Sequence, residues 1–273
     1  MRILIVGGSG YLGGELIRQA VRDGHDVVAT YLGRAGGRRD IQWQRLDIRS
    51  RDQARAVVSA ARPDVVLNTA YRYDDWQATA DGAAILALAA ARTGSHLMHV
   101  SSDAVFSGAA PSYDETATPD PVMPYGAAKA AAEPAVMAVD PAATIARTSL
   151  ITGDGHSQHE AFVRDLAAGR RDGVLFTDDI RCAVHVGDLA AALLELAAIR
   201  PAGVHHLAGT DALSRYELGC LMARREGLDP AALPTGSRAA RGVSGPLDVR
   251  LDCRRTQALL RIRLRGAREF FSG

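Results

Sequence analysis

Short apolar runs alternate with amphipathic segments through the first half of the chain. The apolar runs predict six strands: Arg2–Val6, Asp26–Thr30, Gln42–Leu46, Asp64–Asn68, His96–Val100 and Ala143–Arg147. Apolar residues at helical spacing predict four helices between them: Tyr11–Arg22, Arg51–Ala61, Asp81–Thr93 and Tyr125–Val139. Strands that are apolar almost throughout and separated by helices are typical of a parallel sheet covered on both faces. The pattern therefore predicts an α/β fold.

The alternation of apolar strands and amphipathic helices becomes less regular after about Ile151. Here the sequence predicts helices and one further strand: Gln158–Ala168, Val186–Ala198 and Tyr216–Glu226 for the helices, and Gly203–Leu207 for the strand. The Arg-rich stretch Arg250–Arg268, with Leu and Ile interleaved, predicts an amphipathic terminal helix. We expect residues 1–150 to form the sheet domain and residues 151–273 to form a small, discontinuous C-terminal cap with elements that return to the core.

Composition narrows the class of protein. The 273 residues are 47% hydrophobic, enough for a sizeable core, and their net charge of +1 provides no basic field for nucleic acid. No apolar run approaches the ~20 residues that span a bilayer. The three cysteines have no paired spacing and fit reduced thiols, and the chain opens on a strand rather than on a signal peptide. We therefore expect a soluble, cytoplasmic protein that binds neither nucleic acid nor membrane.

A glycine-rich turn follows the first strand and opens the first helix. It reads GGSGYLG over residues 7–13 and contains the spacing Gly-x-Gly-x-x-Gly from Gly8 to Gly13. Glycines in this place let the backbone turn tightly and approach a pyrophosphate, which binds at the helix N-terminus. The strand before the turn and the helix after it both agree with this interpretation. The turn predicts a doubly wound parallel sheet of the Rossmann type, with Gly7, Ser9 and Gly10 at a dinucleotide.

The end of the second strand bears on which dinucleotide binds. NAD-specific sites place an acid there to hold the ribose 2′-hydroxyl, whereas residues 29–34 read ATYLGR and contain no acid. Arg34, Arg38 and Arg39 follow, and an arginine is able to hold a 2′-phosphate by charge-assisted hydrogen bonds. A solvated basic loop is the alternative. We expect NADP(H) in preference to NAD(H), with Asp47 and Ile48 at the adenine.

One basic residue differs from all the others. The 32 Lys and Arg residues comprise a single lysine, Lys129, and therefore 31 arginines. Lys129 follows Tyr125 by four residues, so both lie on one face of the predicted helix. A nearby ammonium favours the phenolate and brings a phenol of pKa ~10 into the range of acid–base catalysis. Ser102 follows the strand before this helix, where its hydroxyl would hold a substrate carbonyl. A surface Tyr–Lys contact is the alternative, but it does not explain why the sole lysine falls here.

These segments together resemble a known family. The motifs GGSGYLG, LNTA, HVSSDAVFSG, YGAAKAAAE and RTSLITG are similar to those of the extended short-chain dehydrogenase/reductases, and most of all to the dTDP-4-dehydrorhamnose reductase family of sugar-nucleotide reductases. The resemblance is close over Met1–Gly153. It implies a keto reductase in which Tyr125 donates the proton, Lys129 binds the nicotinamide ribose and lowers the pKa of Tyr125, and Ser102 orients the carbonyl.

The same resemblance implies two sets of binding residues. The cofactor set, besides Tyr125 and Lys129, contains Gly10, Tyr11, Leu12, Asp47, Ile48, Ala70, Tyr71, Arg72 and Ser101. The sugar set contains Ser102, Asp103, Leu150 and Arg181.

The chain also departs from that family's pattern. Residues 73–76 read YDDW in place of a threonine–valine–aspartate run, Thr79 rather than asparagine precedes Gly82, and residues 179–185 differ from the family's cap stretch. These changes leave the identity of the substrate open. Sugar dehydratases place an acid pair after the catalytic hydroxyl, whereas Asp103 is followed by Ala104, which argues against dehydration.

Two other functions stay open beside a reductase. One is a nucleotide-sugar epimerase, and the other is a non-catalytic NADP-binding regulatory or sensor protein. His156 and His159 beside Glu160 have a spacing that zinc ligands can have, but we favour a polar loop that opens a helix and expect no metal. The expected partner is a small carbonyl compound, a nucleotide sugar or another, and a homodimer is left open.

Overall fold

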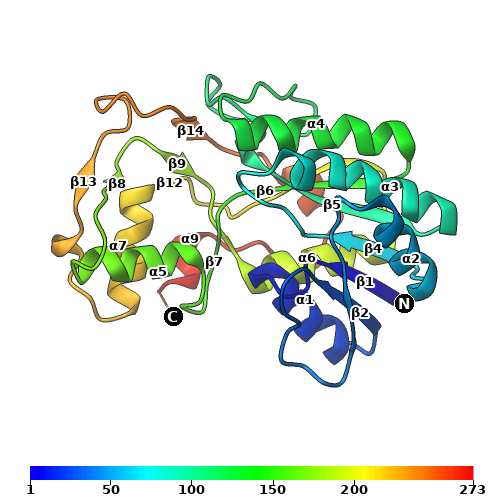
Figure 1. Cartoon of the computed structure of the whole chain (residues 1–273). Helices are drawn as coiled ribbons and strands as arrows, with labels where there is room; N and C mark the ends of the chain where they lie inside the picture. Colours follow the sequence, from blue (N-terminus) through cyan, green and yellow to red (C-terminus); the bar gives the residue numbers. More distant parts are fainter. Residues whose placement is uncertain (273) are drawn as a thin grey trace. The chain divides into compact units, whose positions relative to one another are not determined.

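The computed structural model describes residues 1–272, and the chain divides into two compact units (Figure 1). Unit 1 comprises Met1–Ser102, Pro124–Arg147 and Ala190–His205. Unit 2 comprises Asp103–Met123, Thr148–Leu189 and the chain from His206 onward. The chain passes between the units several times, so their bounds differ from a single division at residue 150. That the two parts serve the cofactor and the substrate stays a prediction.

A seven-stranded sheet forms the centre of unit 1. Its strands are β1 (Arg2–Val6), β2 (Asp26–Tyr31), β3 (Gln42–Arg45), β4 (Val65–Asn68), β5 (His96–Ser102), β6 (Thr144–Thr148) and β11 (Gly203–Leu207). Their order is β11-β6-β5-β4-β1-β2-β3, and β1 pairs in parallel with β2 on one side and with β4 on the other. The Rossmann-type sheet predicted from the sequence is confirmed. Because the chain winds away from β1 in both directions, a crevice opens at the carboxyl ends of β1, β2 and β4.

Helices cover both faces of this sheet. The helical elements outside unit 2 are α1 (Tyr11–Arg22), α2 (Arg51–Ala61), the π-helical turn η1 (Gln77–Asp81), α3 (Gly82–Thr93), α4 (Pro124–Val139) and most of α6 (Val186–Ile199). Helices α2, α3 and α4 pack side by side, and α1 lies on the other face (Figure 1). The helical stretch predicted to start at Asp81 begins four residues earlier, at η1, where the Asp75 carboxylate accepts from the amide of Ala78.

Unit 2 is built from short strands around two longer helices. Its strands are β7 (Ile151–Thr152), β8 (Leu175–Phe176), β9 (Ile180–Arg181), β10 (Val184–His185), β12 (Leu213–Ser214), β13 (Thr235–Gly236) and β14 (Asp248–Val249). The two longer helices are α5 (Gln158–Ala167) and α7 (Arg215–Arg225). The shorter helical elements are η2 (Asp103–Val105), η3 (Pro230–Ala232), α8 (Arg254–Gln257) and α9 (Ala267–Phe270). Capping boxes start α5 at Ser157 and α7 at Ser214.

The predicted terminal helix over Arg250–Arg268 is wrong. Only the four-residue helices α8 and α9 form there. The Gln257 side chain donates to the carbonyl of Ile262 and accepts from the amide of Leu264, so it satisfies backbone groups that a continuous helix would pair internally. Within residues 1–272, no helix is long and apolar enough to cross a membrane. All three cysteines are free thiols.

Candidate cofactor and active site

The glycine turn of unit 1 is tightly packed at two of its positions. Gly7 has φ +85°, and a Cβ atom there would lie 2.9 Å from the Thr69 hydroxyl oxygen. A Cβ atom on Gly13 would lie 2.2 Å from the carbonyl oxygen of Gly7. Helix α1 begins directly after Gly10, whose missing side chain leaves the first amides of the helix without a side-chain cap. Such an N-terminus is suited to bind a pyrophosphate.

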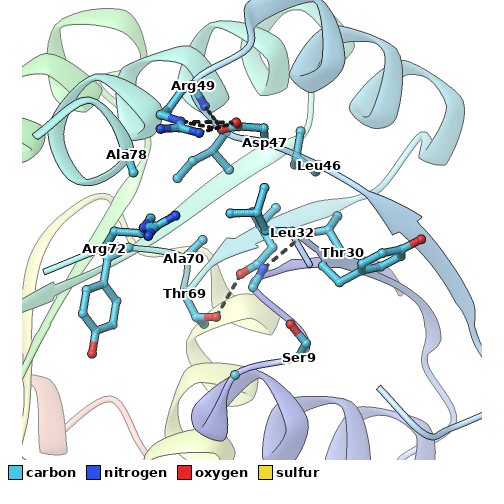
Figure 2. A pocket seen from close by; sticks show the side chains of 16 residues that line it. Ser9, Thr30, Leu32, Leu46, Asp47, Arg49, Thr69, Ala70, Arg72 and Ala78 are labelled. Atoms are coloured by element: carbon cyan, nitrogen blue, oxygen red, sulfur yellow. Dashed lines mark hydrogen bonds and ion pairs between the residues drawn. The ribbon is translucent and has the colours of Figure 1, made fainter. Parts of the chain in front are cut away.

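A pocket lies above this turn, at the carboxyl ends of β1, β2 and β4 (Figure 2). It encloses about 750 Å³, including the solvent at its mouth. Half of its lining was expected at the cofactor: Gly7, Ser9, Gly10, Asp47, Ile48, Ala70, Tyr71 and Arg72. The other half was not singled out from the sequence: Val6, Thr30, Tyr31, Leu32, Leu46, Arg49, Thr69 and Ala78. The remaining expected cofactor residues do not line it: Tyr11, Leu12, Arg34, Ser101, Tyr125 and Lys129.

The pocket residues that were not singled out could have been found from their positions relative to the predicted strands. Most of them end or follow predicted strands, and the crevice of a doubly wound sheet lies at those ends. Thr30 and Thr69 also hold the turn in place. The Thr30 hydroxyl accepts from the amide of Gly7 at 3.2 Å, and the Thr69 hydroxyl donates to the carbonyl of Val6 at 2.9 Å (Figure 2).

Two arginines of the pocket differ in their partners. Arg49 forms ion pairs with Asp47 at 2.7 Å and with Asp75 at 3.0 Å. The hydrogen bonds from Arg49 lower the pKa of Asp47. The guanidinium of Arg72 points into the pocket and has no ion-pair partner among residues 1–272 (Figure 2). Arg72 is therefore available to an anionic group of a ligand, whereas Arg49 is already neutralised.

The arginines of the loop after β2 also differ in whether they have an ion-pair partner. Leu32 lines the pocket, and Arg34 lies two residues further along in an exposed position. Arg38 donates a hydrogen bond to Asp40, with 2.9 Å between Nε and Oδ1, so its guanidinium already has a partner within the protein. No carboxylate of the described chain pairs with Arg34 or Arg39.

The expected catalytic residues all lie on β5 and α4 of unit 1, which pack together. Ser102 is the last residue of β5, and Tyr125 and Lys129 lie one turn apart on α4. Lys129 is buried, and its Nζ donates to the carbonyl of Val100 at 2.9 Å. Burial lowers the pKa of Lys129 to about 8, although the charge of Glu133 opposes this shift.

Three tyrosines gather around this set. The ring of Tyr73 stacks on that of Tyr125, and the ring of Tyr71 lies 5.6 Å from it, centroid to centroid. The ammonium of Lys129 lies 5.1 Å from the centroid of Tyr71. Tyr71 also lines the pocket, so it connects the pocket with the expected catalytic pair. Tyr73 was not singled out from the sequence, because its contact with Tyr125 spans 52 positions of the chain.

Ser101 has a different environment from the one expected. It is buried, and its hydroxyl donates to the Glu133 carboxylate at 2.6 Å rather than facing the pocket. Its expected role at the cofactor stays a prediction.

The expected sugar residues other than Ser102 lie in unit 2. Asp103 is buried and accepts from the Ser149 hydroxyl at 2.6 Å, and Leu150 is half-buried. Arg181 pairs with Asp179 at 2.9 Å, and its guanidinium donates to the carbonyls of residues 180, 246 and 247. The protein thus already occupies the terminal nitrogens of Arg181. Its expected role at the substrate stays a prediction.

The histidines of the zinc-like spacing do not form a ligand set. Glu160 caps α5 through the amide of Ser157, and His159 contacts Arg215, with 3.1 Å between Nδ1 and Nη2. Burial and then the charge of Arg215 lower the pKa of His159 to about 3. Residues 1–272 contain no group of three or more His, Cys, Asp or Glu side chains that could hold a metal ion.

Comparisons with known proteins agree with this geometry. Residues 1–271 match the family described as the RmlD substrate binding domain. The dTDP-4-dehydrorhamnose reductase of Mycobacterium tuberculosis is 35% identical over 84% of this chain and 77% of its own. The chain belongs to this family. The expected resemblance is confirmed, and so, at the level of the family, is the prediction of an NAD(P)-dependent keto reductase of the extended short-chain class.

Two further similarities are informative. The methionine adenosyltransferase 2 subunit beta of Xenopus laevis is 27% identical over 94% of this chain and 82% of its own. The dTDP-4-dehydrorhamnose reductase of Bacillus anthracis, solved in complex with NADP, has the same fold, with a TM-score of 0.85. It is 22% identical, and the match covers 99% of this chain and 97% of that one.

Proposed function

We propose that this protein is an NADPH-dependent reductase that converts a keto group on a nucleotide-linked deoxysugar into an alcohol. One observation carries the proposal. The only lysine of the chain is buried one helical turn from Tyr125, and Tyr71 contacts both residues while it lines the dinucleotide pocket. A lysine placed by chance would lie on the surface, where this chain uses arginine.

The pocket residues fit a nicotinamide dinucleotide. The uncapped N-terminus of α1 and the unpaired Arg72 would hold the pyrophosphate. Asp47 and Ile48 would flank the adenine, and the exposed Arg34 would meet a 2′-phosphate. A nicotinamide held there would supply hydride to the substrate carbon.

The chain's own groups handle the substrate oxygen. Ser102 would donate a hydrogen bond to the carbonyl and orient it, and Tyr125 would transfer its proton to the oxygen as negative charge develops there. The ammonium of Lys129 would stabilise the phenolate that forms when Tyr125 gives up its proton. Burial strengthens this electrostatic effect, because water screens the ammonium less.

Family membership and the relative's name support a sugar nucleotide as the substrate. In unit 2, we assign Asp103, Leu150 and Arg181 to the surroundings of the sugar, as the family resemblance implies. Because Arg181 and Asp103 are buried and held by neighbouring groups, we expect them to shape the sugar site through their packing as well as through contact.

One relative is named as a subunit of methionine adenosyltransferase, and a non-catalytic NADP-binding regulatory or sensor protein is therefore kept as the second candidate function. The presence of Ser102, Tyr125 and Lys129 together argues for catalysis.

The rate of NADPH oxidation against matched carbonyl compounds tests the proposal. The panel contains a dTDP-4-keto-6-deoxyhexose, the same keto sugar without its nucleotide, and a simple ketone. We expect rapid oxidation only with the nucleotide-linked sugar, and none with the Tyr125→Phe variant. NADPH binding without oxidation of any kind would support the regulatory alternative. Interconversion of sugar isomers without net oxidation would support an epimerase.

A further inference from the structure

The carboxylate of Glu133 connects helix α4 with strands β5 and β6. Glu133 on α4 and Arg147 on β6 are 4% and 3% exposed, and Nη2 of Arg147 lies 2.7 Å from Oε2 of Glu133. Nε of Arg147 donates to Oε1 at 3.0 Å, and the Ser101 hydroxyl on β5 donates to the same oxygen at 2.6 Å. The carboxylate therefore has charge-assisted hydrogen bonds to two neighbouring strands.

The position of Glu133 relates it to the catalytic set. It lies four residues after Lys129, as Lys129 lies four after Tyr125, so the three side chains share one face of α4. Ser101 immediately precedes Ser102 on β5. The hydrogen bonds from Lys129 to Val100 and from Ser101 to Glu133 both join the helix to the strand.

We propose that Glu133 is a positioning residue, whose carboxylate fixes α4 against the end of β5 and holds the ammonium of Lys129 and the hydroxyl of Ser102 in place. This inference rests on the proposed function. Glu133 acts through its neighbours, because its carboxylate is buried and occupied by Arg147 and Ser101.

Electrostatics gives Glu133 a second effect on Lys129. Burial lowers the pKa of Lys129, and the negative charge of Glu133 raises it. The other groups beside Lys129 provide no negative charge: burial raises the pKa of Tyr71 after β4, and His99 lies on β5. Burial and then the charge of Lys129 lower the pKa of His99 well below its ordinary value, so His99 stays neutral. Without the charge of Glu133, which opposes the effect of burial, Lys129 would lose its proton more readily.

A purely structural ion pair is the competing explanation, since buried ion pairs can be replaced without loss of function. The two explanations differ in what they predict for Lys129. Because the chain has one lysine, protein labelled with ¹³C at lysine Cε gives a single lysine NMR signal. The pH titration of that signal measures the protonation of Lys129 directly, without any need for catalytic activity.

We expect a midpoint near pH 8 in the unmodified protein. The Glu133→Gln variant keeps the size of the side chain but removes the negative charge that raises the pKa of Lys129. We therefore expect its midpoint to fall by about one unit, and kcat to fall about fivefold at pH 8, because the protonated fraction of Lys129 would fall from about one half to about one eleventh. An unchanged midpoint in folded Glu133→Gln protein would overturn the electrostatic part.

Two more variants separate charge from geometry. Ser101→Ala removes one hydrogen bond and keeps the charge, so the midpoint should stay near 8 while kcat falls several-fold. Asp188→Asn weakens an ion pair with the partly exposed Arg265 in unit 2 (2.8 Å) and should lower stability without moving the Lys129 midpoint.

The outcomes distinguish each kind of failure. If Glu133→Gln does not fold, its lysine signal titrates near the ordinary value of ~10.4, and Ser101→Ala then decides. Full activity of Ser101→Ala would overturn the positioning role. If the unmodified protein reduces no ketone, the proposed function fails, and the NMR midpoints still decide the electrostatic effect of Glu133 on Lys129.

Discussion

The ring of Tyr73 lies nearly parallel to the ring of Tyr125, with 4.8 Å between the centroids and 16° between the planes. Tyr73 belongs to the loop after β4 and remains 59% exposed. It covers a face of the Tyr125 ring, while Tyr71 packs against the same ring at a tilt of 51°. The protein therefore occupies at least one flat face of the Tyr125 ring.

The first prediction concerns this stacked pair. Replacing Tyr73 with Ala should lower kcat/KM about 2- to 12-fold, because an aromatic pair contributes about 0.5–1.5 kcal/mol beyond the area it buries. NADPH affinity should stay the same, since Tyr73 does not line the pocket. Tyr73→Phe is the matched control: it keeps the ring and should behave as the unmodified protein does. Equal kcat/KM in Tyr73→Ala would show that the stack does not influence the reaction.

Tyr125→Phe tests the proton donor. Proton transfer by a positioned side chain contributes about 10²–10⁴-fold to a rate, so kcat should fall by that factor. The Kd for NADPH, measured by fluorescence titration, should change little. If turnover is unimpaired, the phenol is not the donor.

Lys129→Arg tests the lone lysine. Arginine keeps the charge but is bulkier and differently shaped, so we expect weaker NADPH binding and a large loss of rate. The unmodified protein should also lose activity as the pH rises above about 8, because Lys129 then gives up its proton. Full activity of the arginine variant, or a rate that stays constant up to pH 10, would contradict a role for the ammonium.

Arg34→Ala tests the cofactor preference. A charge-assisted hydrogen bond is worth about 1.5–3 kcal/mol, or roughly ten- to hundredfold in preference for NADPH over NADH. The variant should raise the KM for NADPH and leave that for NADH unchanged. Arg38→Ala is the control, because Asp40 already holds Arg38. Salt should weaken the preference, because the loop is exposed. If the unmodified protein uses NADH equally well, the loop arginines are only solvated.

The sequence predicted what depends on local patterns. All seven strands of the sheet, the glycine turn and the placement of Tyr125 and Lys129 on one helix follow from periodicity and spacing. The terminal helix failed because the alternation of Arg with Ile262 and Leu264 has a period of two, which is not that of a helix.

The contacts that complete the candidate site could not be predicted in this way. Glu133 meets Arg147 across 14 positions, and Arg49 meets Asp75 across 26. Tyr73 reaches Tyr125 from a different element. Each depends on which strands become neighbours in the folded sheet, and a single sequence shows no periodic signal for such pairs.

Transfer of deuterium from the cofactor tests the central claim most directly. Purified protein would be mixed with a dTDP-4-keto-6-deoxyhexose and NADPH that carries deuterium at both positions of nicotinamide C4, and the product examined by mass spectrometry and NMR. We expect one deuterium on the new alcohol carbon and one NADPH consumed for each keto group reduced. A cofactor that binds but keeps all its deuterium, with the keto sugar recovered unchanged, would contradict it.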